Sequence, residues 1–401
     1  MIETIALFWQ VRIFALILQR HNKNTMNMSK RNIITALLLA GFSLAAVSQT
    51  AADVAKLRKE ANAGNVKSQV ALGNCLLGGK GVKSDFAEAA QWFTRAANKG
   101  NVEAQFNLAF CYEKGYGVPK SMQSAVEWYT KAANKGSLSA MNSLGHCYDE
   151  GAEGFDKNYA KAVEWYRKAA EKGYAGAQFN LGLCYAQMKG VDLDYKEAVK
   201  WWERAAAQGN AGALYSLAGS YLLGEGVEKD TAKAFGYYLR LADSGDARAQ
   251  YEVAKLYARG EGVPQDNKKA VEYYTRSAER GYAPAQLALG RYYDNGVYVA
   301  QDYEEASKWY LKAAEQGLPE AQYNIGNMCF NGMGIARNYE EAFLWMEKAA
   351  MQSYPPAQTG VGICYYYGYG VKRNKDLGRQ WINKAAAMGD TYAKETLQKL
   401  K

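Results

Sequence analysis

Residues 101–136 read NVEAQFNLAFCYEKGYGVPKSMQSAVEWYTKAANKG, and this stretch decides the fold because its pattern returns along the chain. The closing glycine recurs at positions 64, 100, 136, 173, 209, 245, 281, 317 and 389, and Ser353 takes the remaining place. The step is 36 residues, with a single step of 37. A period of this length is typical of helical repeat arrays. Nine units over residues 65–389 therefore form one array rather than several globular domains.

Each unit predicts two helices. Small or apolar residues stand at the fourth, eighth, ninth and twelfth positions, here Ala104, Leu108, Ala109 and Tyr112. That spacing marks one face of a helix, and Gly115 ends it because a helix C-terminus favours a left-handed residue. The second helix begins after a residue whose side chain can accept a hydrogen bond from the first turn. These residues are Asp85, Ser121, Asn158, Asp194, Asp230, Asp266, Asp302, Asn338 and Asn374.

The shared pattern is A-x-x-x-L-G-x-x-Y-x-x-G-x-G-V-x-x-D-x-x-x-A-x-x-W-x-x-K-A-A-x-x-G, and it resembles the Sel1-like repeat, a relative of the tetratricopeptide repeat. The resemblance implies an all-α fold, a right-handed α-solenoid of nine helix-turn-helix repeats, usually serving as a scaffold for other proteins. Three units depart from the pattern: the third has one extra residue, Tyr298 replaces a loop glycine, and Gly378 replaces a helix alanine. Residues 49–64 and 390–401 are expected to form the terminal caps.

The N-terminal residues predict export. Residues 28–48 have a basic start, an apolar run, and the small residues Ala46 and Ser48 at the spacing of a signal peptidase site. We expect cleavage after Ser48, which would place the mature chain in the periplasm or outside the cell. Residues 1–27 lie upstream of this complete signal and are interpreted as a mis-annotated extension. No membrane span is expected in the mature chain.

Charge and motifs argue against most enzyme classes. The formal net charge is +9, and it becomes +5 once residues 1–48 are removed, which does not imply a polyanionic partner. The phosphate-binding patterns G-x-G-x-x-G and G-x-x-x-x-G-K-[ST] are absent, as are S-x-x-K and G-x-S-x-G. With only His21 and His146, a histidine-rich metal site cannot form. We expect no enzymatic activity, no cofactor and no metal.

A basic residue occupies the thirty-first position of every unit. These residues are Arg95, Lys131, Lys168, Arg204, Arg240, Arg276, Lys312, Lys348 and Lys384. A cation there complements the C-terminal end of the helix dipole, and acidic residues four positions earlier, such as Glu164, can pair with several of them. We therefore interpret the series as structural and expect no nucleic acid partner.

The six cysteines also follow the repeat, since five share the eleventh position and Cys329 takes the twelfth. Equivalent residues of adjacent units stand at least ~8–10 Å apart, beyond the roughly 7 Å between Cα atoms that a disulfide can bridge. We expect buried, unpaired thiols that act as small apolar groups.

The candidate binding residues lie on the first helix, opposite its apolar stripe. The sixth, tenth and thirteenth positions fall on the side expected to line the concave groove, and the tenth position changes chemistry from unit to unit. A mixed aromatic and charged groove suits a peptide or protein. The candidates are Phe106, Phe110, Glu113, His146, Asp149, Phe179, Tyr215, Tyr251, Lys255, Arg291, Asp294, Tyr323 and Asn327.

The sequence thus predicts an exported, monomeric, non-enzymatic scaffold or adaptor that binds a protein or peptide in its groove. One alternative is a cell-envelope enzyme or binder that acts on β-lactam or peptidoglycan-like ligands. Another is a eukaryotic secretory-pathway adaptor of the same fold, because a signal peptide does not fix the kingdom.

Overall fold

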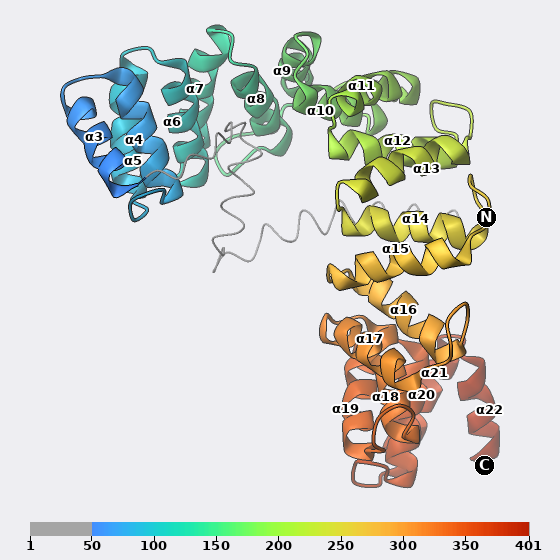
Figure 1. The fold of residues 1–401 in the computed structure, drawn as a ribbon. Helices are drawn as coiled ribbons and strands as arrows, with labels where there is room; N and C mark the ends of the chain where they lie inside the picture. Colours follow the sequence, from blue (N-terminus) through green and yellow to red (C-terminus); the bar gives the residue numbers. More distant parts are fainter. Residues whose placement is uncertain (1–49, 401) are drawn as a thin grey trace. The chain divides into compact units, whose positions relative to one another are not determined.

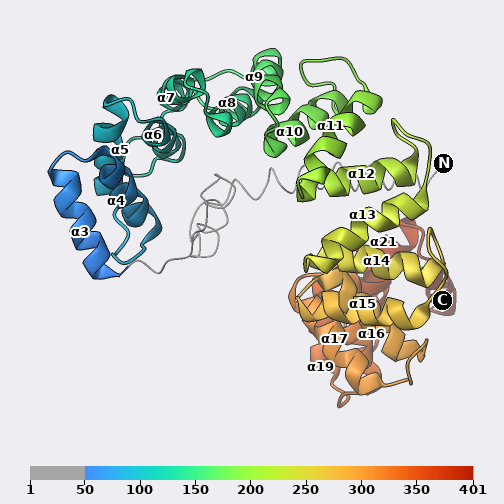
Figure 2. The same ribbon diagram turned by 45° about the horizontal axis from the view of Figure 1, so that its top comes forward.

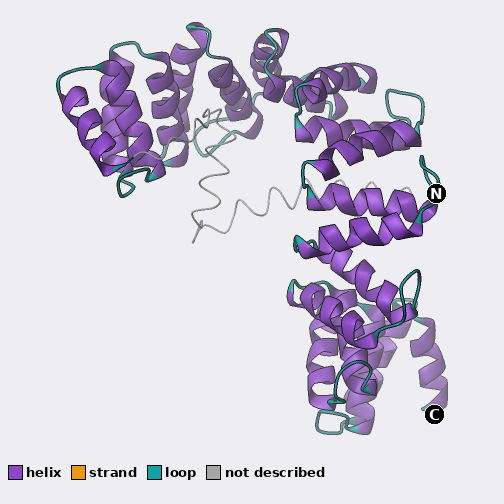
Figure 3. Ribbon diagram, viewed as in Figure 1, coloured by secondary structure: helices purple, strands orange, loops and turns teal. Residues whose placement is uncertain are grey.

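The computed structural model describes residues 50–400, which form helices joined by short corners (Figures 1 and 3). Within these residues there are 20 helices and no strand, so the prediction of an all-α helical repeat fold is confirmed. An isolated bridge joins Ala152 and Phe155 in the corner of the third repeat. The predicted signal peptide and upstream extension lie outside the described residues.

The helices follow one another with nearly uniform length. They are α3 (Ala51–Asn62), α4 (Val66–Gly78), α5 (Phe86–Asn98), α6 (Val102–Lys114), α7 (Met122–Asn134), α8 (Leu138–Glu150), α9 (Tyr159–Glu171), α10 (Ala175–Ala186), α11 (Tyr195–Ala207), α12 (Ala211–Leu223), α13 (Thr231–Asp243), α14 (Ala247–Arg259), α15 (Asn267–Glu279), α16 (Ala283–Asn295), α17 (Tyr303–Glu315), α18 (Pro319–Asn331), α19 (Tyr339–Met351), α20 (Pro355–Tyr367), α21 (Lys375–Ala387) and α22 (Thr391–Lys399). The expected caps contain α3 and α22. None of the helices in this part of the chain has the length and apolar character needed to cross a bilayer.

The described residues divide into two compact units, 50–193 and 194–400, and the boundary falls inside the fourth repeat. The described helices of the first unit are α3 to α10, and those of the second are α11 to α22. In each unit every helix packs against the helix that follows it. Figure 2 shows α4, α6 and α8 on the inner side of the arc of the first unit, with α5, α7 and α9 on its outer side.

Local chemistry sets where the helices begin and end. All nine predicted capping residues accept a hydrogen bond from the first turn of the second helix, as Asp85 does from the Glu88 N–H at 2.9 Å. First helices end mostly at a left-handed glycine, as at Gly115 with φ 74°. In the fourth repeat the position of this glycine is occupied by Met188, with φ 55°. The sequence-based prediction did not identify this departure.

The two helices of a repeat approach closely at the ninth position, which is always glycine or alanine. A Cβ added to Gly73 would lie 2.5 Å from the Phe93 ring, and one added to Gly145 would lie 2.5 Å from the Tyr166 ring. The aromatic residue of the second helix therefore fills the space that a larger side chain would need. This contact contributes to the buried clusters that the helix pairs form along each unit.

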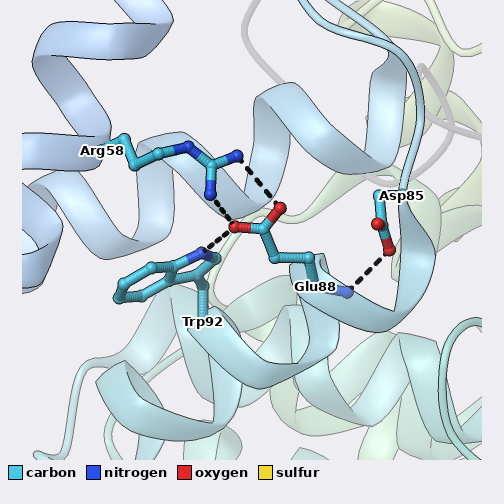
Figure 4. A network of polar contacts seen from close by, with 4 residues as sticks. All are labelled: Arg58, Asp85, Glu88 and Trp92. Carbon is cyan, nitrogen blue, oxygen red and sulfur yellow. Dashed lines mark hydrogen bonds and ion pairs between the residues drawn. The ribbon is translucent and has the colours of Figure 1, made fainter.

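The cap helix α3 is fastened to α5 by a polar network (Figure 4). Glu88 forms an ion pair with Arg58, accepts a second hydrogen bond from Arg58 Nη2 at 3.0 Å, and accepts one from Trp92 Nε1 at 3.0 Å. The Arg58 hydrogen bond is the main reason that the pKa of Glu88 is lowered. The array thus begins with a docked helix.

Candidate functional site

The candidate residues divide between the two compact units. The first unit holds Phe106, Phe110, Glu113, His146, Asp149 and Phe179, on α6, α8 and α10. The second holds Tyr215, Tyr251, Lys255, Arg291, Asp294, Tyr323 and Asn327, on α12, α14, α16 and α18. The candidates therefore form two sets, one on the first helices of each unit, and each set is described by itself.

The sixth position joins neighbouring repeats in the second unit. The Tyr215 hydroxyl donates a hydrogen bond to Asp246, the first residue of the next repeat. The Tyr251 ring lies 5.4 Å from that of Tyr282, which occupies the same first position. Tyr323 makes the equivalent contact at 5.7 Å, with Tyr354. Burial raises the pKa of Tyr215 and Tyr251, so these side chains serve the packing of the array as well as its surface.

In the first unit, the sixth-position aromatic side chains are also packed. Phe106 is buried, and its ring lies 5.4 Å from that of Tyr129 in the same repeat. Phe179 is half-buried. These two candidates present less surface to a partner than their apolar character alone predicts.

The tenth position varies in exposure as well as in chemistry. Phe110 is 8% exposed, with its ring 5.9 Å from that of Tyr116 in the following corner, so it belongs to the core more than to a surface. His146 and Arg291 are exposed, while Lys255 and Asn327 are half-buried. The charged members already have partners. These ion pairs are Lys255–Glu252, at 2.7 Å, and Arg291–Glu320.

The candidate acidic residues at the thirteenth position already form hydrogen bonds or ion pairs, both in the first unit and in the second. Glu113 accepts a hydrogen bond from the Tyr129 hydroxyl at 2.8 Å, and Asp294 accepts one from the Tyr310 hydroxyl at 3.2 Å. Burial, followed by the nearby carboxylate, raises the pKa of both tyrosines. Asp149 instead forms an ion pair with Lys189 at 3.0 Å.

A set of asparagines links adjacent first helices in the first unit. Asn107 Nδ2 donates to Asn74 Oδ1 at 2.9 Å, and Asn74 Nδ2 donates to Glu103 at 3.0 Å. Asn180 Nδ2 donates to Asn142 Oδ1 at 3.0 Å. The sequence reading did not single out Asn107 and Asn180, although both stand at the seventh position of their units.

A buried glutamine series connects seven of the nine repeats to the helix that precedes them, and the sequence-based prediction did not include it. In seven repeats the fifth-position glutamine Nε2 donates to an alanine carbonyl near the end of the preceding second helix, at 3.1 to 3.3 Å. The fifth repeat has Leu214 there, and Arg240 Nη2 donates to the Ala206 carbonyl at 3.1 Å instead. The register of neighbouring repeats thus depends on buried polar bonds.

The basic residues at the thirty-first position contact aromatic rings, in addition to complementing the C-terminal end of the helix dipole. Eight of the nine lie over the aromatic ring three residues earlier, as Lys131 Nζ does at 3.7 Å from the Trp128 ring centroid. Ion pairs with an acid four residues earlier occur at Lys168 and Arg276. A cation held on an indole face is a common stabilising contact, and it explains why Trp and a basic residue recur together.

All six cysteines are buried and form no disulfide, as expected. Burial raises the pKa of Cys111, Cys147 and Cys184 to about 12, and that of Cys329 and Cys364 to about 11. Such thiols are weak nucleophiles because little thiolate forms near neutral pH.

Comparison with known proteins follows the same repeat boundaries. A family model described as Sel1 repeat matches residues 66–101, 102–137, 138–174, 175–210, 211–246, 247–282, 283–318, 319–354 and 355–390. A protective antigen of uropathogenic Escherichia coli that displays an SLR fold is 32% identical, with a TM-score of 0.51, over 85% of this chain and 88% of the antigen. A Sel1 repeat protein from Oxalobacter formigenes is 34% identical, with a TM-score of 0.51, over 61% of this chain and 96% of that protein. The comparison with curated proteins finds no match.

Proposed function

Because the chain belongs to the Sel1 repeat family, we propose that it is an exported, monomeric scaffold that binds a protein or peptide along the first helices of its repeats. Sel1 repeat proteins generally act as protein-interaction scaffolds, and their fold is generally non-enzymatic. Export rests on the signal-like residues 28–48. The partner is a folded surface or an extended segment that reaches several repeats.

The observation that carries the proposal is the tenth position of the first helices. Neighbouring positions repeat because they hold the array together, whereas this position changes in both charge and size. Its surface members within the described chain include His146, Lys255, Arg291 and Asn327. A scaffold whose packing positions repeat while one surface position varies has the means to recognise one partner among many.

The polar bonds between first helices also favour a peptide or protein ligand. An asparagine side chain has both a donor and an acceptor, so the side chains of Asn142 and Asn180 can exchange their mutual bond for bonds to a peptide backbone. In the second unit, the half-buried aromatic residues Tyr251 and Tyr323 add apolar contact area on the first helices. Both features suit recognition of a polypeptide better than a small polar ligand.

The experiment is affinity capture with the purified chain from envelope and host extracts, with the retained proteins identified by mass spectrometry. The groove variant combines Lys255→Ala and Asn327→Ala, which avoids the sixth-position tyrosines that join the repeats. The matched control combines Lys196→Ala and Gln380→Ala, exposed positions on second helices. We expect a protein retained by the wild type and by the control to be lost from the groove variant.

Circular dichroism must show equal helicity and equal thermal unfolding for the three chains. Equal capture of the same protein by all three would contradict binding along the first helices of the second unit. Loss from the control but not from the groove variant would move the binding surface to the second helices.

A further inference from the structure

One edge of the first unit carries a dense set of exposed cations. The C-terminal ends of α3, α5 and α7 are neighbours, because Lys99 after α5 bonds the Gly64 carbonyl after α3, and Lys135 after α7 bonds the Gly100 carbonyl after α5. The next second helix in the series is α9. We call these residues the basic edge. They are Lys59, Arg95, Lys99, Lys131, Lys135, Lys168 and Lys172, and all seven are exposed.

Six of the seven form like-charged pairs four residues apart, one at the end of each of three helices. The pairs are Arg95 with Lys99, Lys131 with Lys135, and Lys168 with Lys172. Like charges at this spacing destabilise a helix by about 0.2–0.5 kcal/mol per pair, and the helix dipole compensates part of that cost. The positive charge of the second residue in each pair is therefore not explained by helix stability.

The structural task of the second cation does not require charge. Lys99 Nζ donates to the Gly64 carbonyl at 3.0 Å, and Lys135 Nζ donates to the Gly100 carbonyl at 2.7 Å. At the same position of the eighth repeat, Gln352 Nε2 donates to the Gly317 carbonyl at 3.0 Å. A neutral amide thus makes the same bond between repeats.

The second unit differs at this position. Its residues are Gln208, Ser244, Arg280, Gln316, Gln352 and Met388, so one of six is basic. The doubled cations are therefore a feature of the first unit and not of the repeat.

Nearby carboxylates offset only part of the charge. Glu164 pairs with Lys168 at 2.6 Å, and Glu127 and Glu171 lie on the same helices. Two further carboxylates lie at this end of the repeats and keep their charge: Glu60 accepts from the Ser68 hydroxyl at 2.6 Å, and Glu103 accepts from Asn74. The seven cations thus outnumber these five carboxylates. A row of cations remains, spaced by roughly one helix diameter, ~10 Å, from helix to helix.

We propose that the basic edge binds an anionic polysaccharide, whose charged groups follow the row of helix ends. The exposed large apolar side chains described in the first unit are Tyr159 and two residues of the corner after α10, Met188 and Leu193, so the basic edge has no anchor for a membrane. The indole faces of Trp128 and Trp165 are covered by their own lysines, so they offer no platform for stacked bases. This surface is separate from the groove face.

The test uses heparin, a sulfated polysaccharide, as the probe for the purified full chain. The variant is Lys99→Gln, Lys135→Gln and Lys172→Gln, because glutamine preserves the bond that this position makes elsewhere in the array. The matched control is Lys229→Gln, Lys268→Gln and Lys372→Gln, three exposed lysines of the second unit. Both variants lose the same charge.

We expect the wild type and the control to bind heparin with similar dissociation constants, and the edge variant to bind at least about tenfold more weakly at 0.15 M salt. The thermal unfolding temperature should be unchanged in the control and unchanged or slightly higher in the edge variant, which loses three like-charged pairs. Equal weakening by the two variants, or no heparin binding by the wild type, would overturn the proposal. Binding to anionic vesicles or RNA that depends on these lysines, with heparin ignored, would overturn the assignment to a polysaccharide.

Discussion

Tyr298 occupies a backbone position that most other corners give to glycine, with φ 63° and 57% of its surface exposed. The corresponding glycines press against the backbone at the start of the preceding second helix. A Cβ added to Gly262 would lie 2.2 Å from the Thr231 carbonyl oxygen. Because Tyr298 already carries a Cβ, the corner of the seventh repeat cannot press on its neighbour as closely as the corner of the sixth does.

This difference predicts unequal costs for alanine at the two corners. Gly262→Ala combines a left-handed backbone, which costs roughly 1–2 kcal/mol for a residue with a Cβ, with the clash against Thr231. We expect it to lower the free energy of unfolding by more than about 2 kcal/mol. Tyr298→Ala loses its ring contact with Tyr292, 6.1 Å away, and should cost less than about 1 kcal/mol. Urea unfolding measures both, and equal costs would contradict the account.

The buried cysteines predict slow labelling and a loss of stability at high pH. With the pKa of Cys111, Cys147 and Cys184 raised from 9.0 to about 12 by burial, the folded state holds protons that the unfolded state releases. The stabilising contribution is therefore complete below pH 9 and is lost as the pH rises from 9 towards 12.

Thiol titration tests directly whether the cysteines are buried and unpaired, and urea unfolding between pH 9 and pH 12 tests the loss of stability. The native chain should react slowly with a thiol reagent at pH 8, and the unfolded, unreduced chain should show six free thiols. Fewer than six would indicate disulfides, and rapid labelling of the native chain would show that the thiols are accessible.

At the scale of helices, buried hydrogen bonds hold neighbouring repeats together, and different side chains can donate the same bond. The fifth repeat lacks the usual glutamine, and Arg240 supplies the bond to the Ala206 carbonyl. We expect Arg240→Ala to destabilise the chain by about 1–3 kcal/mol, because the Ala206 carbonyl loses the hydrogen bond from a charged guanidinium and keeps only the backbone bond from the Gly209 N–H at 2.9 Å. Adding Leu214→Gln should restore most of the loss, since glutamine makes this bond in seven other repeats.

The matched control is Arg276→Ala in the sixth repeat, where Gln250 already bonds the equivalent carbonyl at 3.2 Å. That change should cost no more than about 1 kcal/mol, because Arg276 is an exposed ion-pair partner. Thermal unfolding of the four chains measures the effect. A cost for Arg240→Ala that Leu214→Gln leaves unchanged would mean that the carbonyl bond is not its cause.

The sequence predicted the helices well because their signals are local. Capping residues such as Asp85 and terminal glycines such as Gly115 act within their own turn, so spacing alone places them. Contacts between repeats were harder to predict from the sequence, because they depend on the direction and length of side chains from residues far apart in the chain. Phe110 looked like a surface residue by its position, yet its ring turns to Tyr116, and the partner of Tyr251 is Tyr282, 31 residues away.

At the scale of the whole chain, nine Sel1 repeats supply a framework whose packing positions recur and whose tenth position does not. The described helices group into two compact units, each with its own first-helix face. The groove face and the basic edge use different parts of the repeat, so the chain has two separate surfaces to offer. A partner protein on the first helices is the central claim.

Site-specific photocrosslinking tests that claim most directly. A benzophenone amino acid replaces His146 or Lys255 on the first helices, and Lys196 on a second helix, in three otherwise identical chains. After incubation with extract and irradiation, we predict that one protein is linked through positions 146 or 255 and is absent from the chain labelled at 196. The same protein linked through position 196, with positions 146 and 255 unlabelled, would contradict binding along the first helices.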